Sequence, residues 1–497
     1  MRKLLLIASF AVLCVVANPL HAQRYLTEVF TSNTVTANNV YASNITVITG
    51  APTLDTLYYD VYEPAGDTMA ERPVVIVSHT GSFLPSPQNG QATGSRTDSA
   101  VVTICNKLAA RGFVAVAMSN RFGWNPLGTQ DERTGTLLNA AYRGIQDART
   151  LVRHLRDNYS NGGNTYAINP NQVIMGGMGT GGYISLGCGY LDSYDEINLA
   201  KFLDVGTGIS YVDTSLSGDV EGKWNRPLNI GNYVNESSEV QFVFNMGGAV
   251  GDSSWIEAGE PPVASVACPN DPFAPYAFGA VIVPTTGDFV VNVSGSQGVQ
   301  ERAQRLGINS SFDANIYVDP TSLQAATVNG GLNGLMPFNR PTPESAPWEQ
   351  WNQAIWDAVP HPSGGTFHTV GLMTNPDMSA AKSNNYIDST LNFIVPRIVC
   401  SLSLGNCAAA TNATSTVETL DVSFFPNPST NFLNIAAGNA NAIESVVVTD
   451  LSGRQVKAIN GLNVTAFELD HTGMANGMYF ITVQTRKGAV TQKLLFN

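Results

Sequence analysis

The sequence has little charge, and basic residues are the scarcer sign. Only 13 % of its 497 residues are charged, with 26 Lys and Arg against 39 Asp and Glu, for a net charge of −13. Binding to a nucleic-acid backbone needs a basic face, so nucleic acid is excluded as a partner. The apolar share of 43 % is that of ordinary globular proteins. No long span combines low hydrophobicity with high net charge, which excludes extended intrinsic disorder. The length of the chain favours two to three domains.

Long apolar runs are missing beyond the first residues of the chain. Arg2 and Lys3 precede an apolar run at 4–16, and Leu20-His21-Ala22 then offers a small residue for cleavage. The run is shorter than the roughly 20 residues that span a bilayer. The pattern therefore predicts a signal peptide at 1–22 rather than a membrane anchor, and an exported mature chain without a transmembrane segment.

Cysteine is also scarce, with six in the chain, and no Cys/His cluster has zinc-site spacing. We therefore predict no metal and no other cofactor. In an oxidising compartment some cysteines are expected to pair. Cys400 and Cys407 bracket a short polar loop and are the candidate disulfide. Cys105 reads as a small buried hydrophobe. Pairing of Cys188 with Cys268 stays open, because spacing does not determine connectivity.

The composition changes near the end of the chain. Residues 401–420 are rich in Ser, Ala, Thr and Asn without hydrophobic periodicity, which predicts an exposed linker. Beyond it, residues 421–497 contain short alternating strands, among them 446–450, 478–483 and 491–496, separated by turn residues. Several such strands in fewer than eighty residues predict a small β-sandwich.

Motifs in this last region carry a resemblance. They are Phe425-Pro426-Asn427-Pro428, Asn476-Gly477-Met478-Tyr479-Phe480 and the terminal Lys493-Leu494. The region resembles the C-terminal sorting domain of the type IX secretion system. The resemblance implies a bacterium of the Bacteroidota, the type IX machinery as a partner, and secretion or cell-surface attachment after passage through the periplasm and outer membrane. The alternative, a carbohydrate-binding β-sandwich, lacks a row of exposed aromatic residues.

Residues 23–400 alternate strands and helices. Continuous apolar runs at 73–78 and 113–118 are typical of strands buried on both faces, and 173–175, 242–244 and 263–266 are further strands. Amphipathic helices are predicted at 99–110, 142–159 and 379–398. This alternation predicts an α/β domain with a doubly wound, mostly parallel sheet.

A glycine-rich turn follows the strand at 173–175. Gly176-Gly177-Met178-Gly179-Thr180-Gly181-Gly182 leads into a helix that runs to Tyr190. Such a turn serves either as a phosphate cradle or as a nucleophile elbow of the form G-x-S-x-G. A dinucleotide fingerprint normally follows the first strand of its unit. Because this turn comes after two strand–helix units, the elbow is the better interpretation.

Three further segments stand in the order that an elbow predicts. His79-Thr80-Gly81-Ser82 ends the first long buried strand, where an oxyanion loop belongs. Asp271 follows the strand at 263–266, and His368 precedes the final helix. The order elbow, acid, histidine is that of the α/β-hydrolases.

From these positions, and from Tyr142-Arg143-Gly144-Ile145-Gln146-Asp147-Ala148-Arg149, residues 55–400 resemble the α/β-hydrolase superfamily, in particular its secreted esterases. The resemblance implies cleavage of a small-molecule or polymeric ester by a Ser–His–acid mechanism, with backbone N–H groups holding the oxyanion. Gly177 and Gly181 then flank the nucleophile, and His79 orients the oxyanion loop; the alternative for His79 is a core histidine at a strand end.

One departure changes the functional prediction. Gly179 stands where the family has its serine, and glycine cannot form an acyl-enzyme. Thr180 is the adjacent hydroxyl, either a displaced nucleophile or a helix cap that supplies an oxyanion N–H. Two functions follow: ester hydrolysis by Thr180 with His368 as base and Asp271 as its partner, or a catalytically inactive binding or cell-surface protein.

The candidate acid and base have alternatives. Asp271 before Pro272 is also a turn former, and Asp288 is a second candidate acid. His361 is a second candidate base, and His368 can be a structural histidine. Three tryptophans either line an acyl pocket or belong to a helix packed on the domain: Trp348, Trp351 and Trp356.

Overall fold

The computed structural model describes residues 24–283, 287–405, 407–410, 422–438, 441–450, 454–486 and 488–497. The predicted signal peptide at 1–22 and the second half of the predicted linker lie outside these residues. No helix among the described residues is long and apolar enough to cross a membrane.

The largest element is an eight-stranded sheet with the order β1-β2-β4-β3-β5-β6-β8-β11. Its strands are β1 (Asn33–Thr46), β2 (Thr53–Pro64), β3 (Arg72–Ser78), β4 (Val114–Met118), β5 (Ile168–Met178), β6 (Phe242–Met246), β8 (Val263–Ala267) and β11 (Leu335–Pro337).

Only β2 runs against the other strands of this sheet. It pairs antiparallel with both β1 and β4, whereas the pairs from β4 through β11 are all parallel. Counted within the sheet, the order is 1-2-4-3-5-6-7-8 with the second strand reversed. This is the α/β-hydrolase arrangement, so the predicted fold class is confirmed.

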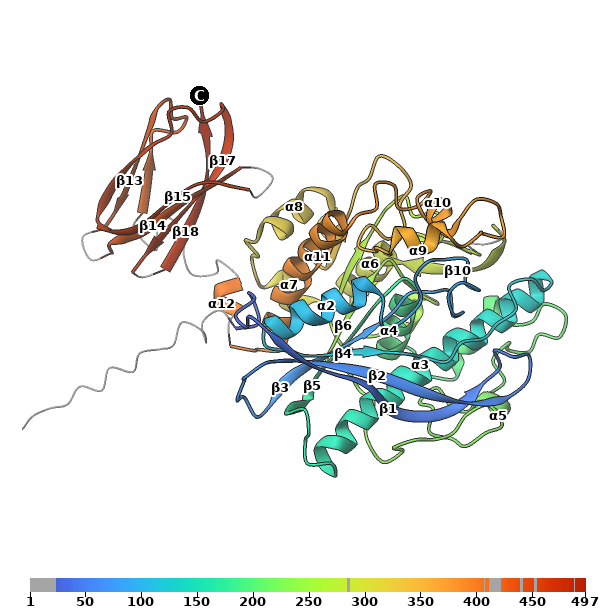
Figure 1. Ribbon diagram of the computed structural model, residues 1–497. Helices are drawn as coiled ribbons and strands as arrows, with labels where there is room; N and C mark the ends of the chain where they lie inside the picture. The colour runs from blue at the N-terminus through green and yellow to red at the C-terminus, as the bar shows by residue number, and fades with distance from the viewer. Residues whose placement is uncertain are drawn as a thin grey trace, which may run out of the picture.

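Helices cover both faces of the sheet, and α2 lies beside α11 on one face while α3 and α4 lie on the other (Figure 1). The helices are α2 (Ser99–Ala110), α3 (Gln130–Ser160), α4 (Thr180–Tyr190), α5 (Thr214–Ser217), α6 (Ser296–Leu306), α7 (Ser310–Asp313), α8 (Pro320–Val328), α9 (Gln353–Asp357), α10 (Phe367–Gly371), α11 (Ala380–Ser401) and α12 (Cys407–Ala410), with 3-10 turns η1 (Asp195–Asn198), η2 (Ala200–Phe202) and η3 (Ser253–Trp255).

The period-two alternation of the strands divides the interior into two cores. On β3, Val74 and Ile76 belong to the core beneath α3 and α4, whereas Val75 and Val77 belong to the core beneath α2 and α11. Successive side chains of a strand point to opposite faces, so one continuous apolar run supplies both cores.

A small antiparallel sheet with the order β7-β10-β9 is not predicted from the sequence. Its strands are β7 (Ala249–Val250), β10 (Phe289–Gly295) and β9 (Phe278–Ile282). The start of α3 is also missed, because its first turn is polar. Thr129 and Glu132 form a capping box there, which starts the helix twelve residues before the predicted 142.

The C-terminal region forms two antiparallel sheets around one apolar core, as the predicted β-sandwich requires. The first has the order β12-β13-β16 and the second β15-β14-β17-β18. Their strands are β12 (Val422–Phe425), β13 (Phe432–Ala437), β14 (Ile443–Asp450), β15 (Gln455–Val464), β16 (Ala466–Asp470), β17 (Gly477–Thr485) and β18 (Gly488–Phe496).

The predicted disulfide and the predicted buried cysteine are both present in the structure. Cys400 and Cys407 form a disulfide with their Cα atoms 4.6 Å apart. Cys105 is free and buried on α2, as a small hydrophobe would be. The open question is also settled, since Cys188 and Cys268 are each free and buried.

Candidate functional site

The glycine-rich turn joins the end of β5 to the start of α4, as an elbow does. Gly179 stands at its tip with φ 52° and ψ −118° and is the N-cap of α4. Its N–H donates to the carbonyl of Met246 at 2.8 Å, which ties the turn to β6. Residues with side chains are strained at such dihedrals, and active sites are where that strain is normally tolerated. The turn therefore has the sharp strand-to-helix backbone that the elbow interpretation requires, with no side chain at its tip.

Gly177 and Gly181 allow the close approach that this turn needs. A Cβ atom on Gly177 would lie 2.2 Å from the carbonyl oxygen of Gly181. A Cβ atom on Gly181 would lie 2.2 Å from the carbonyl oxygen of Ser78. Both obstacles are backbone atoms that cannot rotate away. Glycine is thus required at both flanking positions, because a tight elbow turn leaves no room for a Cβ atom there.

Thr80 occupies the space beside the tip of the elbow. A Cβ atom on Gly179 would lie 2.4 Å from Oγ1 of Thr80 and 3.2 Å from its Cβ. The sequence placed Thr80 on an oxyanion loop but did not pair it with Gly179. The two residues are 99 positions apart, and β3 and β5 bring them together as neighbouring parallel strands. The side chain of Thr80 therefore fills the space that a side chain at position 179 would need.

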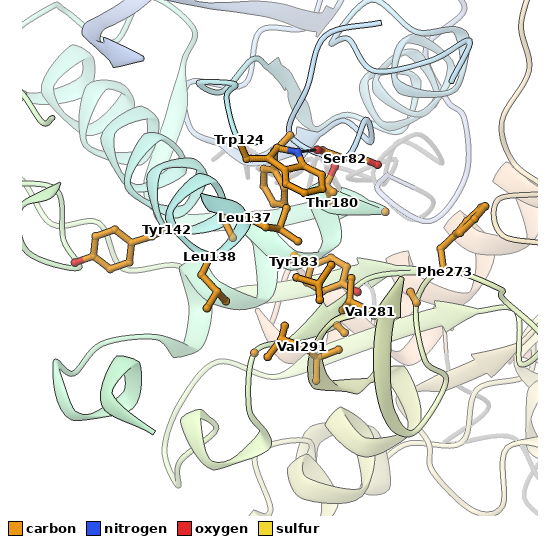
Figure 2. Close-up of a pocket in the computed structure, with 18 of the residues that line it drawn as sticks. Ser82, Trp124, Leu137, Leu138, Tyr142, Thr180, Tyr183, Phe273, Val281 and Val291 are labelled. Carbon is orange, nitrogen blue, oxygen red and sulfur yellow. Dashed lines mark hydrogen bonds between the residues drawn. The ribbon is translucent and has the colours of Figure 1, made fainter. Parts of the chain in front are cut away.

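Thr180 is the first residue of α4, and it does not cap the helix. Gly179 is the N-cap, and no side chain accepts a hydrogen bond there, which corrects the capping interpretation of Thr180. The side chain of Thr180 instead lines an apolar cavity, near Ser82 and Trp124 (Figure 2).

The predicted oxyanion loop has a defined local structure. Nδ1 of His79 bonds to the carbonyl of Thr80, so that nitrogen carries the proton, because a carbonyl only accepts. Gly81 has φ 123°, and its Cβ would lie 2.7 Å from Cα of Gly94. His79 is buried, and burial lowers its pKa. His79 therefore holds the carbonyl of the loop.

Asp271 follows β8 at the expected place, but its carboxylate is used locally. Oδ1 accepts the N–H groups of Phe273 and Ala274, and Oδ2 accepts the hydroxyl of Ser345 at 3.0 Å. Among the residues that the structure describes, no histidine hydrogen bonds to this carboxylate. Burial raises its pKa to about 6. The alternative acid, Asp288, pairs with Arg133 at 3.5 Å.

Neither candidate histidine has the tautomer of a catalytic base. Nδ1 of His368 accepts the indole N–H of Trp351 at 3.2 Å. Nδ1 of His361 accepts the backbone N–H of Ser363 at 3.1 Å. An indole and a backbone amide only donate, so each Nδ1 holds a lone pair and each Nε2 carries the proton. A triad histidine has the opposite arrangement, with Nδ1–H on the acid and Nε2 free to accept.

Two cavities meet at the elbow. The first, which we call the apolar cavity, has a volume of about 160 Å³. Its wall comes from α3, the η2 region and the β9–β10 hairpin (Figure 2). Leu137, Leu138, Val281 and Val291 are among its lining residues. The unpredicted small sheet thus forms one side of this cavity.

The second cavity, which we call the polar cavity, has a volume of about 370 Å³. Trp348, Trp351 and His361 line it, whereas His368 lines neither cavity. The tryptophans do not share a helix, because α9 begins at Gln353, after the first two; Trp356 packs on Phe367 at 5.4 Å between ring centres. The following residues line both cavities: Thr80, Gln91, Gly179, Gly247, Phe273 and Ser345.

Glu349 on the wall of the polar cavity was not singled out from the sequence. Its side chain is buried, and Oε2 accepts the hydroxyl of Thr93 at 2.8 Å. Burial raises its pKa to about 8. No periodicity marks it, because it lies in a long loop between β11 and α9. Within the described ranges, no group of three or more His, Cys, Asp or Glu side chains is arranged to hold a metal ion.

The comparisons with solved structures give weak likenesses to esterases. Esterase 2 of Thermogutta terrifontis phosphoramylated by tabun is 13 % identical over 75 % of this chain and 95 % of that one, with a TM-score of 0.37. The same enzyme phosphorylated by paraoxon is 17 % identical over 49 % and 73 %, at 0.30. A truncated carbohydrate esterase from gut microbiota is 16 % identical over 56 % and 86 %, at 0.32. With scores this low, the fold assignment stands on the strand order alone.

A comparison with curated protein sequences finds no match. The family described as "Secretion system C-terminal sorting domain" matches residues 423–497. These are the strands of the C-terminal sandwich, whose motifs resemble the type IX sorting domain. The chain therefore carries a C-terminal sorting domain of the type IX secretion system, and its destination is the medium or the cell surface.

Proposed function

We propose that this chain is an exported binding protein on an α/β-hydrolase fold, which holds a small apolar or amphiphilic ligand beside its elbow without cleaving it. One observation carries the proposal: the tip of the elbow is Gly179, and Oγ1 of Thr80 occupies the space where a side chain at 179 would begin. An acyl-enzyme needs a nucleophilic atom at that point.

The surrounding side chains support the same function. Asp271 is hydrogen bonded to Ser345 and two backbone amides, and neither His361 nor His368 presents Nε2 as an acceptor. A site that had lost only its serine at position 179 would still have a histidine base hydrogen bonded to its acid, and neither His361 nor His368 bonds to Asp271. Three separate departures at three positions are typical of a site that no longer performs the family's chemistry, and fold alone does not imply function.

The cavities support a retained binding role. An apolar cavity with a few converging polar groups is the ordinary form of a small-molecule site. The apolar cavity keeps its walls from α3 and the β9–β10 hairpin and opens toward Gly179. Ester substrates of the related enzymes would then be ligands here rather than substrates.

The experiment measures hydrolysis and binding on the mature chain, residues 23–497. We expect no enzymatic hydrolysis of p-nitrophenyl hexanoate, while calorimetry detects binding of ethyl hexanoate, which the protein leaves intact. Leu138→Arg, which places a charge in the apolar cavity, is expected to abolish binding, and an exposed change such as Leu127→Arg is the matched control. Turnover above the uncatalysed rate, or binding that Leu138→Arg leaves unchanged, would overturn the proposal.

A second candidate function is ester hydrolysis with Thr180 as nucleophile, His368 as base and Asp271 as its partner. One observation favours it, since the hydroxyl side chain of Thr180 faces the apolar cavity rather than capping α4. Hydrolysis by the wild type that is lost in Thr180→Ala and kept in Thr180→Ser would establish this function. Hydrolysis that appears only in Gly179→Ser would instead identify a decayed triad.

We also propose that residues 1–22 are a signal peptide and that the source is a bacterium of the Bacteroidota. The positive start and short apolar run support the first, and the sorting domain supports the second. N-terminal sequencing of the exported protein tests the cleavage site, and a first residue other than Gln23 would contradict it.

A further inference from the structure

Glu349 is a buried carboxyl that the proposed function has not used. Its residue is 9 % exposed, and Oε2 accepts the hydroxyl of Thr93 at 2.8 Å. Across the described ranges, Oε1 has no hydrogen-bond partner in the protein, and no Lys or Arg forms an ion pair with Glu349. A buried charge is normally paired, and an unpaired one is costly. The protein therefore leaves one acceptor of this acid available to the polar cavity.

The surroundings of Glu349 do not supply the missing positive charge. The charged group that acts on it most is Asp98, itself negative, which accepts the backbone N–H groups of Gly94 and Ser95. His361 on the same cavity is used locally, because its Nδ1 accepts the backbone N–H of Ser363 and its Nε2 lies 3.2 Å from the carbonyl oxygen of Gly90. Burial and Asp98 together raise the pKa of Glu349 to about 8. A ligand that brings a positive charge would offset the cost of ionising the buried Glu349 carboxyl.

Aromatic rings line the same cavity. Trp348 and Trp351 belong to its wall, on either side of Glu349 in the chain. The indole N–H of Trp351 is used by His368, so the ring, rather than its donor, is what remains for a ligand. A carboxylate beside indole rings is the combination that recognises an ammonium ion, through a charge-assisted hydrogen bond and cation–π attraction.

The polar cavity continues into the apolar cavity at the elbow. Six residues line both, and Gly179 is one of them. Gly179 itself places no side chain between the two cavities, and Oγ1 of Thr80 lies 2.4 Å from where a Cβ atom at 179 would stand. A ligand can therefore place a charged group near Glu349 and an apolar chain among the α3 and β9–β10 side chains.

We infer that the two cavities bind an amphiphilic amine, with its ammonium group donating to Oε1 of Glu349 and its alkyl chain in the apolar cavity. This inference rests on the proposed binding function and names its ligand class. Glu349 is the residue that selects the charged head group, and the apolar wall selects the chain.

The test compares two probes of equal chain length, hexylammonium and 1-hexanol, by calorimetry on residues 23–497 at pH 8.5. At this pH Glu349 is largely ionised and hexylamine remains protonated. We expect hexylammonium to bind more tightly than 1-hexanol. Glu349→Gln is expected to weaken hexylammonium binding by about 10- to 100-fold, the usual effect of losing a hydrogen bond to a charged group. Affinity for 1-hexanol stays unchanged, which also shows that the variant is folded.

The matched control is Glu301→Gln, which removes an exposed acid on α6 and is expected to change neither affinity. Equal affinities of the two probes, or no effect of Glu349→Gln on hexylammonium, overturn the inference while the binding function stands. Failure of both probes and of ethyl hexanoate to bind overturns the binding function itself. An equal loss in Glu301→Gln would mean general charge attraction and also overturns the role of Glu349.

Discussion

The site has two walls that are built on opposite principles. The elbow wall is formed by the loop at 79–82 and the β5–α4 turn. Its close packing requires glycine, without a side chain, at Gly177, Gly179 and Gly181. The acid wall, formed by Asp271 and residues 345–351, depends on the buried carboxyl groups of Asp271 and Glu349, whose pKa values are raised by burial. The elbow wall has the same backbone constraint at every pH, whereas the acid wall is titratable. On both walls the residues stand in the chain order that the sequence predicts, but Asp271 hydrogen bonds to Ser345 and backbone amides rather than to His361 or His368.

The largest expected effect concerns the acid wall and pH. The pKa of Glu349 is about 8 in the folded state and near 4.5 without burial. A raised carboxyl pKa means that the folded state binds the proton more tightly. Its stabilising contribution is therefore complete below pH 4.5 and is lost as pH rises through 8, by up to roughly 5 kcal/mol. Glu349→Gln should gain stability relative to the wild type between pH 5 and pH 9.

Urea unfolding of both chains at the two pH values measures this difference directly, because every other titrating group is shared. If the unfolding free energies of the wild type and Glu349→Gln changed with pH in parallel, ionising Glu349 would not destabilise the fold. The acid wall would then be no more sensitive to pH than the elbow wall.

The next effect concerns the elbow wall. Gly181→Ala places a Cβ atom 2.2 Å from the carbonyl oxygen of Ser78, so α4 must move away from β3. We expect a loss of about 3 kcal/mol, the upper range of overpacking effects. Gly206→Ala is the control, since its nearest atom would be at 3.4 Å. Urea unfolding at constant pH measures both, and an equal small effect would contradict the tight approach.

A smaller effect tests the complementarity of Gly179 and Thr80. Gly179→Ala should cost about 2 kcal/mol, partly from its positive φ and partly from Oγ1 of Thr80. In a Thr80→Gly background only the backbone part remains, roughly 1 kcal/mol. A double-mutant cycle measures the coupling, and strict additivity of the two changes would show that the side chains do not compete for space.

The smallest effect concerns the hydrogen bond between Ser345 and Asp271. Ser345→Ala removes a donor to Oδ2, so the pKa of Asp271 should rise further above about 6. The variant should lose about 1 kcal/mol at pH 7.5 and less at pH 5, because the ionised carboxylate is the better acceptor. Unfolding free energies at both pH values measure this, and a loss that is the same at both would contradict it.

The sequence predicted the elements that show a regular pattern. Helix α2 has the predicted bounds, and β3 and β4 differ from prediction by one residue at one end. The β7-β10-β9 sheet was missed, because β7 has only two residues and β9 is mostly half-exposed. The elbow was predictable from glycine spacing. Its partner Thr80 was not, because contact between residues 99 positions apart depends on strand order.

The sequence by itself determined the buried strands of the main sheet, the glycine-rich turn, the lack of a side chain at position 179 and the sorting domain, since each depends on local composition or spacing. Only the tertiary structure decided what the loops at 271, 345–351 and 361–368 do. There, hydrogen bonds from Ser345, Ser363 and Trp351 set the state of Asp271, His361 and His368. A residue's protonation depends on its partners in space, and no pattern along the chain specifies those partners.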